Sequence, residues 1–472
     1  MRAALHVFLG ALATAAMAQA PPRPLPVRTM SGRTMVAPQL SYLDNGVVKI
    51  GADLAMGGAI AYFSRSGSSD SVINIHDLGR EVQPSFYGGP APFGTSHPAY
   101  PGWGWNPIGA GDVYGNPSQV VATSNDGQTI YVREIPMQWA LNNVPCECFV
   151  ETWITLDGQA ANVRYRLTNH RADLTFYDAW GQELPAVLTI GRLNRIFTYD
   201  GPAPYTGDDV RQLPSTRGPA PVYRPTEHWI AMVDASGWGL GVLNTEVYSF
   251  LAALGGDPDT PGGPTDDSLG YIAPSRNEIL DHNIAYTYDV SLILGTLEDI
   301  RGYAVAHRRT ETRPDFHFSP DQFQEDRQHF TYANATDSGL PLKGGLRVDL
   351  SQNDPQIWLP EGRWDAASVP TLYLTAAFHT HETQGEIFWA IPGQGFDGSR
   401  RLDFPVIPDG QMRTYAISLS SSPAYYGVIT QLRLDPSDGG IAGDFIEIQS
   451  VSFRPETSAG RSPVVVRPRG PS

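Results

Sequence analysis

The sequence predicts an all-β protein that is built from two β-rich domains. Charged residues make up only 17% of the chain, aromatic residues make up 10%, and 48 glycines and 40 prolines supply frequent turns. Short segments with alternating apolar residues recur from Leu40 onward and are separated by Asn-Gly, Asp-Gly and Gly-Gly pairs. At 472 residues, the chain is also longer than one hydrophobic core usually supports, which favours two domains.

The first domain is expected at residues 36–310, where eight segments have the composition of strands. These segments are 47–50, 59–63, 129–135, 149–156, 162–168, 228–233, 240–243 and 284–294. Asn-Gly or Asp-Gly pairs at 45–46, 126–127 and 157–158 predict tight hairpin turns between such strands. One helix is predicted at 297–309, because Thr296 can cap it and acidic residues lie in its first turn.

A second, smaller β-sandwich is expected at residues 341–456, after a polar linker at 311–340. Its predicted strands are 345–350, 371–378, 386–390, 412–419, 429–434 and 445–453. The tail at 457–472 is rich in Ser, Gly, Arg and Pro, so we expect it to be disordered.

The N-terminal residues 1–18 have the pattern of a secretory signal peptide. Arg2 provides a positive charge, an apolar run follows at 7–18, and Ala16-Met17-Ala18 offers small residues for cleavage. The alternative, a helix of the folded core, is disfavoured because the proline-rich segment 20–24 follows at once. The run is too short to span a bilayer, so we expect a secreted or periplasmic protein without a membrane span.

The charge balance argues against nucleic acid as a partner. The formal net charge is −16, with 49 acidic and 33 basic residues, whereas phosphate binding relies on clustered lysine and arginine. The two cysteines, Cys146 and Cys148, would face the same way on a strand at a separation near the upper limit for a disulfide. A bridge is one alternative, but the sequence favours two partly buried free thiols.

The first domain has GGAIAYFS at 57–64 near its start and then a strand that ends in INIHDLGR at 73–80. With these segments and its many later strands, it resembles the large antiparallel super-sandwich of galactose mutarotases and related carbohydrate-active enzymes. In the second domain, MRTYAISLSSSPAYYGVITQLRLDP at 412–436 and FIEIQSVSF at 445–453 are similar to jelly-roll carbohydrate-binding modules. The resemblance implies a large antiparallel super-sandwich followed by a jelly roll, with a poly- or oligosaccharide as the partner. The catalytic histidine motif of mutarotases is not reproduced residue by residue, so no catalytic role is carried over.

A dense group of polar residues at 72–87 suggests a functional site in the first domain. His76, Asp77, Arg80 and Tyr87 lie where a short apolar strand runs out into a loop, a common place for binding and catalytic groups. The aromatic segment that follows supplies Trp103 and Trp105, which we expected to stack on sugar rings.

Cleavage of a glycosidic bond usually needs two carboxyl groups. Glu183 was the preferred candidate, because small and apolar neighbours would bury it and raise its pKa. A carboxylate that accepts backbone hydrogen bonds was the competing interpretation. Further carboxylates and adjacent histidines completed the predicted catalytic and binding set: Asp77, His76, Glu227, His228, Glu278, Asp281 and His282.

Three functions were therefore left open. The preferred one is a glycoside hydrolase that uses a carboxylate pair in the first domain. The second is a polysaccharide lyase in which Tyr87 or His76 abstracts a proton and Arg80 neutralises a uronic acid, although Arg80 could equally form a salt bridge to Asp77 or Glu81. The third is a glycan-binding protein without catalysis, with Trp103 and Trp105 as its platform.

Metal sites received less support from the sequence, and no cofactor was expected. His379 and His381 would share a strand face and could bind a transition metal with a further ligand. Hard oxygen ligands at Asp435, Asp438 and Asp444 would suit a structural calcium ion, although acidic turn residues are the commoner explanation.

Overall fold

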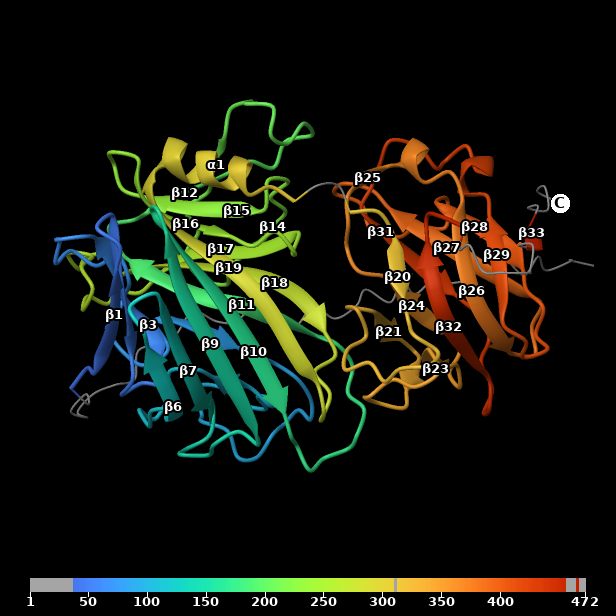
Figure 1. The fold of residues 1–472 in the computed structure, drawn as a ribbon, viewed down its shortest axis with the longest axis horizontal. Helices are drawn as coiled ribbons and strands as arrows, with labels where there is room; N and C mark the ends of the chain where they lie inside the picture. The colour runs from blue at the N-terminus through green and yellow to red at the C-terminus, as the bar shows by residue number, and fades with distance from the viewer. Residues whose placement is uncertain (1–36, 310–311, 456–463, 467–472) are drawn as a thin grey trace, which may run out of the picture.

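The computed structural model describes residues 37–309, 312–455 and 464–466, and it is almost entirely β-structure. Two β-sandwiches lie side by side, the first formed by the N-terminal part of the chain and the second by the C-terminal part (Figure 1). The predicted all-β fold class is confirmed. Within these described ranges, no helix is long and apolar enough to cross a membrane. The predicted signal peptide at 1–18 lies outside the described residues.

The first sandwich consists of a ten-stranded and a nine-stranded sheet. The ten-stranded sheet has the order β1 (Leu40–Asp44), β2 (Val48–Asp53), β3 (Ala59–Arg65), β4 (Val82–Ser85), β11 (Trp180–Ile190), β18 (Leu269–Glu278), β17 (Ser249–Gly255) and β14 (Val222–Tyr223). In addition, β5 (Pro107–Ile108) pairs with β4, and β8 (Met137–Gln138) pairs with β5. The nine-stranded sheet has the order β13 (Arg211–Leu213), β12 (Arg195–Thr198), β15 (Trp229–Val233), β16 (Trp238–Leu243), β19 (Ala285–Thr296), β10 (Ala160–Asn169), β9 (Cys148–Asp157), β7 (Thr129–Ile135) and β6 (Gln119–Asn125).

The nine-stranded sheet follows the alternation that the sequence predicts. In β10, Val163, Tyr165 and Leu167 are buried, whereas Arg164 and Arg166 are exposed on the opposite face. All three predicted turns join antiparallel neighbours, namely β1 to β2, β6 to β7 and β9 to β10. The inner faces of both sheets share one apolar core.

Helix α1 (Leu297–Ala306) covers the end of the nine-stranded sheet. Thr296 caps it as predicted: the Thr296 side chain accepts a hydrogen bond from the Asp299 amide, and the Asp299 carboxylate accepts one from the Thr296 amide. Ile300 and Ala304 are buried in a separate apolar cluster between the helix and this sheet. The helix ends three residues earlier than predicted, so the basic residues at 307–309 lie beyond its last turn.

The second sandwich consists of a seven-stranded and a five-stranded sheet. The seven-stranded sheet contains β22 (Thr336–Asp337), β23 (Leu346–Asp349), β32 (Phe445–Ser452), β26 (Leu372–His379), β29 (Arg413–Ile417) and β33 (Val464–Val466), with β20 (Asp315–His317) beside β32. The five-stranded sheet contains β21 (Thr331–Ala333), β24 (Gln356–Trp358), β31 (Gln431–Asp435), β27 (Gln384–Ala390) and β28 (Arg401–Pro405). A separate pair joins β25 (Trp364–Asp365) to β30 (Val428–Ile429), and two short 3-10 helices lie at Ala366–Ser368 and Leu419–Ser421.

The second sandwich begins earlier in the chain than the sequence indicated. Residues 311–340, which we expected to form a linker, contribute β20, β21 and β22 to its sheets. These strands have only two or three residues, too few to show an alternating pattern. Of the predicted tail, only residues 464–466 are described, and they form β33 beside β29.

The favoured interpretation of the cysteines was wrong, because Cys146 and Cys148 form a disulfide. Cys146 precedes β9 and lies outside the strand. The local bend brings the two Cα atoms to 5.0 Å, inside the usual range for a bridge and closer than two residues of extended strand allow.

The two sandwiches meet across a buried polar and aromatic junction. Arg327 of the second sandwich donates hydrogen bonds to Asp281 of the first at 2.6 Å and to Asp337 of its own at 2.5 and 2.7 Å. Phe176 stacks on Tyr332 with ring centroids 6.3 Å apart. One continuous cluster of buried apolar side chains includes residues of both sandwiches.

Candidate functional site

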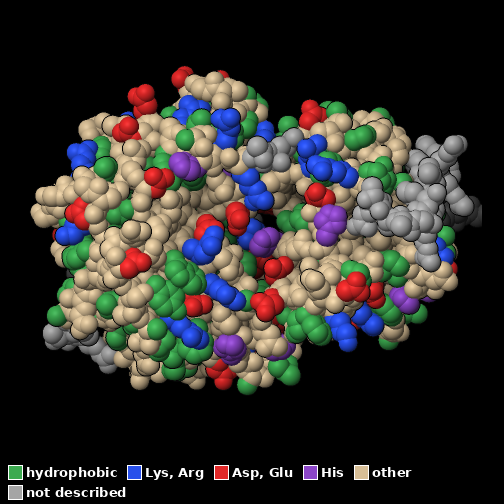
Figure 2. Space-filling model, in the orientation of Figure 1, with side chains coloured by type: hydrophobic (Ala, Val, Ile, Leu, Met, Phe, Trp, Pro, Cys, Tyr) green, Lys and Arg blue, Asp and Glu red, His purple; other side chains and the backbone are tan. Residues whose placement is uncertain are grey.

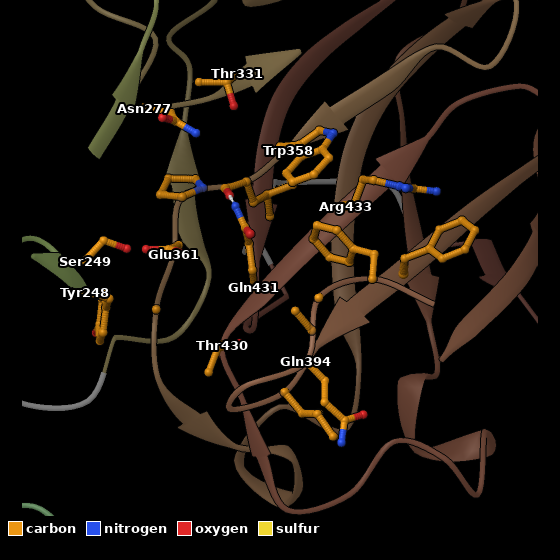
Figure 3. A pocket seen from close by; sticks show the side chains of 18 of the residues that line it. Tyr248, Ser249, Asn277, Thr331, Trp358, Glu361, Gln394, Thr430, Gln431 and Arg433 are labelled. Atoms are coloured by element: carbon orange, nitrogen blue, oxygen red, sulfur yellow. Dashed lines mark hydrogen bonds between the residues drawn. The ribbon is translucent and has the colours of Figure 1, made fainter. Parts of the chain in front are cut away.

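A cleft of about 1560 Å³ opens between the two sandwiches. One wall is the outer face of the ten-stranded sheet, with residues of β11, β17 and β18, and the other is the outer face of the five-stranded sheet. Charged and histidine side chains gather where the two sandwiches meet (Figure 2). Ser249 and Asn277 lie across the cleft from Trp358, Gln431 and Arg433 (Figure 3).

The first wall carries a row of polar residues that lie directly opposite one another on four neighbouring strands. In order across the sheet, they are Ser85 of β4, Glu183 of β11, Ser275 of β18 and Ser249 of β17. The Tyr271 hydroxyl donates a 2.5 Å hydrogen bond to Glu183 Oε1, and Ser85 Oγ donates to the Tyr87 hydroxyl at 3.1 Å. Two of the predicted site residues, Glu183 and Tyr87, therefore lie in this wall.

Glu183 lies inside strand β11, although Gly181 and Pro185 beside it are residues that usually weaken a strand. The register between β11 and β18 shifts between Glu183 and Val187, so Pro185 lies at a bulge. Proline is tolerated at a bulge because no ladder hydrogen bond is required of it there. The rigid sheet therefore fixes the position of the Glu183 carboxylate, which is only 2% exposed.

The opposite wall has a row of alternating aromatic and cationic side chains. Trp358 of β24, Arg433 of β31, Phe388 of β27 and Arg401 of β28 lie opposite one another in this order. The Arg433 guanidinium lies 3.9 Å from the centre of the Phe388 ring. Phe396 packs edge-on against Trp358 at 4.9 Å, so the wall presents ring surfaces next to charged groups.

Side-chain amides lie beside these rings. Gln356 accepts a hydrogen bond from Trp358 Nε1 at 3.1 Å, and Gln431 donates to the Leu359 carbonyl at 2.7 Å. Both contacts hold the amides in place on the cleft wall. Gln394 is on the exposed hairpin at the cleft edge (Figure 3). Fixed amides next to aromatic faces can bind a ligand that combines hydroxyl groups with flat apolar surfaces.

A second row on the same wall is acidic. Asp435 of β31 lies opposite Glu386 of β27, which in turn lies opposite Asp403 of β28. Burial, reinforced by nearby negative charges, raises the pKa of Glu386 to about 7 and that of Asp435 to about 6, although Arg401 and Arg433 partly oppose the shifts. Of this row, the sequence indicated only Asp435, as a candidate calcium ligand, whereas Glu386 and Asp403 were not predicted as site residues.

Within the polar group at 72–87, Tyr87 lines the cleft, whereas His76, Asp77 and Arg80 do not. Arg80 is fully buried: it donates to the Asp267 carbonyl at 2.5 Å and to Asp267 Oδ1 at 2.7 Å, and its Nε lies 3.0 Å from Asp77 Oδ1. His76 Nδ1 is 2.7 Å from the Thr265 carbonyl. These contacts join the segment to the connection between β17 and β18, so the salt-bridge interpretation of Arg80 is confirmed.

Glu227 and His228 also have partners away from the cleft. Arg301 donates two hydrogen bonds to Glu227, at 2.8 and 3.0 Å, and Trp229 Nε1 donates a third at 3.0 Å. Burial would raise the pKa of Glu227, but the bonds from Arg301 and the other donors lower it overall, which removes a proton donor at neutral pH. His228 lies against Tyr248, and burial lowers the pKa of its ring.

Glu278, Asp281 and His282 belong to the junction between the sandwiches. Burial of Glu278 would raise its pKa, but the charges of His329 and Arg276 outweigh burial and lower the pKa to about 2. Asp281 accepts a hydrogen bond from Arg327, and His282 Nδ1 lies 3.9 Å from Asp281 Oδ1. These three candidate residues therefore do not line the cleft that contains Glu183.

The predicted aromatic platform is also not formed. Trp105 is 1% exposed and packs beneath the Arg171 guanidinium at 5.0 Å. Trp103 donates to Asn106 Oδ1 at 3.0 Å and packs against Tyr100 at 5.3 Å. Both side chains therefore support the loop at 86–116, and the aromatic cleft surface comes from Trp358, Phe388 and Phe396 of the second sandwich.

The two metal-site alternatives are not supported. His379 stacks on Phe445 at 4.0 Å, while His381 Nδ1 lies 2.5 Å from Asp444 Oδ2. Asp435 accepts a hydrogen bond from Arg433, and Asp444 is paired with His381. In the part of the chain that the structure describes, no group of three or more His, Cys, Asp or Glu residues could hold a metal ion.

The sequence matches no known protein-family profile and no curated protein. One similar solved structure is a galactose mutarotase related enzyme from Lactobacillus acidophilus, with 9% sequence identity and a TM-score of 0.37 over 55% of this chain and 98% of that chain. Another is a galactose mutarotase-like protein from Lactobacillus casei, with 10% sequence identity and a TM-score of 0.35 over 54% of this chain and 100% of that chain. An alpha-N-acetylgalactosaminidase from Bifidobacterium bifidum is also similar, with 12% sequence identity and a TM-score of 0.30 over 54% of this chain and 36% of that chain. Because these TM-scores are below 0.5, we draw no functional conclusion from them.

Proposed function

We propose that this protein binds a poly- or oligosaccharide in the cleft between its two sandwiches. The observation that carries the proposal is the wall of the second sandwich, where Trp358, Phe388 and Phe396 present rings beside the fixed amides of Gln356 and Gln431. Sugar rings have apolar faces that pack on aromatic side chains, and their hydroxyl groups pair with amides. Export to an oxidising compartment is part of this proposal and is supported by the Cys146–Cys148 disulfide.

The opposite wall is suited to the hydroxyl-rich edge of a sugar. Ser249, Ser275 and Asn277 project from neighbouring strands of a rigid sheet, so their positions are fixed before a ligand arrives. A ligand in a cleft with two such walls would lose solvent on both faces, which strengthens each polar contact. Acidic residues outnumber arginines in the cleft lining, which disfavours a uronic acid polymer and with it the lyase alternative.

One observation favours a second candidate function, hydrolysis of the bound sugar. Glu183 is the only member of the predicted catalytic set in the cleft lining, and the Tyr271 hydroxyl holds its Oε1 at 2.5 Å. A carboxyl group fixed in this way can give a proton to, or take one from, a sugar oxygen. Hydrolysis needs a further group for the opposite side of the bond.

The test is affinity electrophoresis of the purified protein in gels that contain one of several neutral polysaccharides. Replacing Trp358 by Ala should weaken retardation about tenfold, because an aromatic contact contributes on the order of 1 kcal/mol. The control is Trp153→Ala, since Trp153 lies on β9 of the other sheet and packs against Tyr131. Equal retardation of both variants and the unaltered protein would refute binding in the cleft.

Reducing-end release separates the two candidate functions. A polysaccharide that retards the protein should yield reducing ends if the cleft is catalytic, and Glu183→Gln should abolish the release while retardation persists. Retardation without any reducing ends or unsaturated uronate absorbance would leave binding as the function. Reducing ends that survive in the Glu183→Gln variant would exclude Glu183 from the chemistry.

A further inference from the structure

The acidic row of the second sandwich is unfavourable for the stability of the sheet. Asp435, Glu386 and Asp403 occupy directly opposite positions on three neighbouring strands, so their side chains share one face. Like charges placed in this way repel each other and destabilise strand pairing. The presence of such a row in the wall of a cleft is more readily explained by a role in ligand binding than by a role in folding.

The arginines beside the row compensate for it incompletely. Arg433 donates to Asp435 Oδ2 at 2.6 Å, and Arg401 lies 2.8 Å from Glu386 and 3.4 Å from Asp403. Asp435 is 3% exposed and lines the cleft, yet its Oδ1 atom has no hydrogen-bond partner among the described residues. An acceptor that is buried without a partner costs on the order of 1 to 3 kcal/mol, so this oxygen is ready for a donor from a ligand.

Two further carboxylates add to the negative charge at this end of the cleft. Asp354 and Asp438 both line the cleft, and both contribute to the raised pKa of Asp435. Five carboxyl groups therefore surround two guanidinium groups here. Burial raises the pKa of the two central groups, and the neighbouring carboxylates add to this rise.

The neighbouring row supplies surfaces that suit a sugar carrying such a charge. Phe388 is two residues from Glu386 on β27 and faces the same side of the sheet. Phe396 and Trp358 extend this apolar surface along the cleft. A ring stacked on these aromatics would place its substituents next to the carboxylates, and aromatic faces also attract cations.

On the basis of the glycan-binding cleft described above, we propose that Asp435 and Glu386 bind a protonated amino group, so that the ligand is a glycan with free amino sugars. The ammonium group supplies three hydrogen-bond donors, one for the unpaired Oδ1 of Asp435 and one for Glu386. It also lowers the local repulsion along the row. A divalent cation is not the favoured occupant, because no described group of side chains has a ligand set for a metal.

The test compares three hexasaccharides with the same β-1,4-linked backbone by isothermal titration calorimetry at about pH 6.5. Cellohexaose carries a hydroxyl group at each second carbon, chitohexaose carries an acetamide, and the fully deacetylated hexamer carries an amine. The deacetylated hexamer should bind at least about tenfold more tightly than the other two, because hydrogen bonds to charged groups contribute more than neutral ones.

Proton release gives a second readout that needs no variant. An ammonium group next to Glu386 and Asp435 lowers the pKa of both carboxyl groups. The other charged groups around these two residues are Arg401, Asp403, Arg433, Asp354 and Asp438. At about pH 5 the amino groups already carry their protons before binding, so the two carboxyl groups should release protons when the hexamer binds. The measured heat should then differ between buffers with different ionisation enthalpies. Neutral hexamers should show no such difference.

Glu386→Gln and Asp435→Asn each remove one charge without changing size, and each should abolish the preference for the amine. Asp349→Asn on the other sheet is the control for net charge, since Asp349 pairs with Arg347 on β23. A protein that binds neutral polysaccharides but shows no preference for the amine, or keeps the preference in both variants, would overturn this inference and leave the glycan-binding proposal intact. Heat from calcium alone that disappears in both variants would also overturn it, by assigning the site to a metal. Failure to bind any polysaccharide or hexamer would refute both proposals.

Discussion

Replacing Arg327 by Met should destabilise the protein strongly, because Arg327 is the only cation in direct contact with two buried carboxylates at the junction, as far as the described residues show. Arg327 is 3% exposed, and it donates two hydrogen bonds to Asp337 and one to Asp281. Methionine fills a similar volume but leaves both carboxylates uncompensated. Breaking a buried pair in this way costs about 3 to 5 kcal/mol, so we expect the free energy of unfolding to fall by that amount.

Urea denaturation followed by tryptophan fluorescence measures this change. The matched control is Arg164→Met, since Arg164 forms a pair with Asp289 in which the two side chains are 59% and 54% exposed. Exposed pairs contribute about 0 to 1 kcal/mol, so this variant should unfold almost as the unaltered protein does. Adding Asp281→Asn and Asp337→Asn to the Arg327→Met variant should restore part of the loss, because both stranded charges are then removed. A loss below about 1 kcal/mol for Arg327→Met would refute the reasoning, since it would show that the junction tolerates these charges.

Three further predictions concern other parts of the molecule. The folded-state pKa of Glu278 is about 2, below the ordinary 4.5. The ionised group therefore contributes about 3 kcal/mol to the free energy of unfolding above pH 4.5, and this contribution is lost as the pH falls towards 2. Urea midpoints measured between pH 7 and 3 should fall less steeply in the Glu278→Gln variant than in the unaltered protein. Replacing Cys146 and Cys148 by Ser opens a ring of only three residues and should cost about 1.5 kcal/mol in urea unfolding, whereas a loss of 4 or more would indicate a different role. Gly241→Ala should lower the free energy of unfolding by about 1 to 3 kcal/mol, because a Cβ atom there would lie 2.3 Å from Ile300 Cγ2 of helix α1. The thermal midpoint should fall accordingly, and an unchanged midpoint would contradict this clash.

Much of the nine-stranded sheet could be predicted from the sequence because it has one face in water. The alternation of β10 and the Asp157-Gly158 turn before it both follow from that condition. The strands that carry the cleft were harder to find. Most residues of β11 and β18 are buried, since their inner face packs in the core of the sandwich and apolar residues on their outer face pack with Ala220, so no clear alternation remains. Pro185 then suggested a break where the strand has a bulge.

The candidate site could be predicted only in part, for a related reason. Glu183 was correctly placed among apolar neighbours, but a single sequence does not reveal which acids have distant cationic partners. Glu227 pairs with Arg301, 74 residues away, and Asp281 pairs with Arg327, 46 residues away. The wall with Trp358 was missed because the second domain was regarded as an accessory to the first, whereas the cleft is shared by both.

The apolar cluster that continues from one sandwich into the other has a consequence for how the protein unfolds. Phe176 of the first sandwich and Tyr332 of the second bury each other, so separating the sandwiches would expose both rings to water. We therefore expect one cooperative transition for the whole chain instead of two independent melting events. A fragment cut near residue 311 would carry an uncovered apolar surface and a tendency to aggregate. In this respect the second sandwich differs from a module that is joined to its neighbour only by a linker and can be transferred between proteins. A chimera that combines one of these sandwiches with another protein would need a complementary junction as well as a complementary cleft wall.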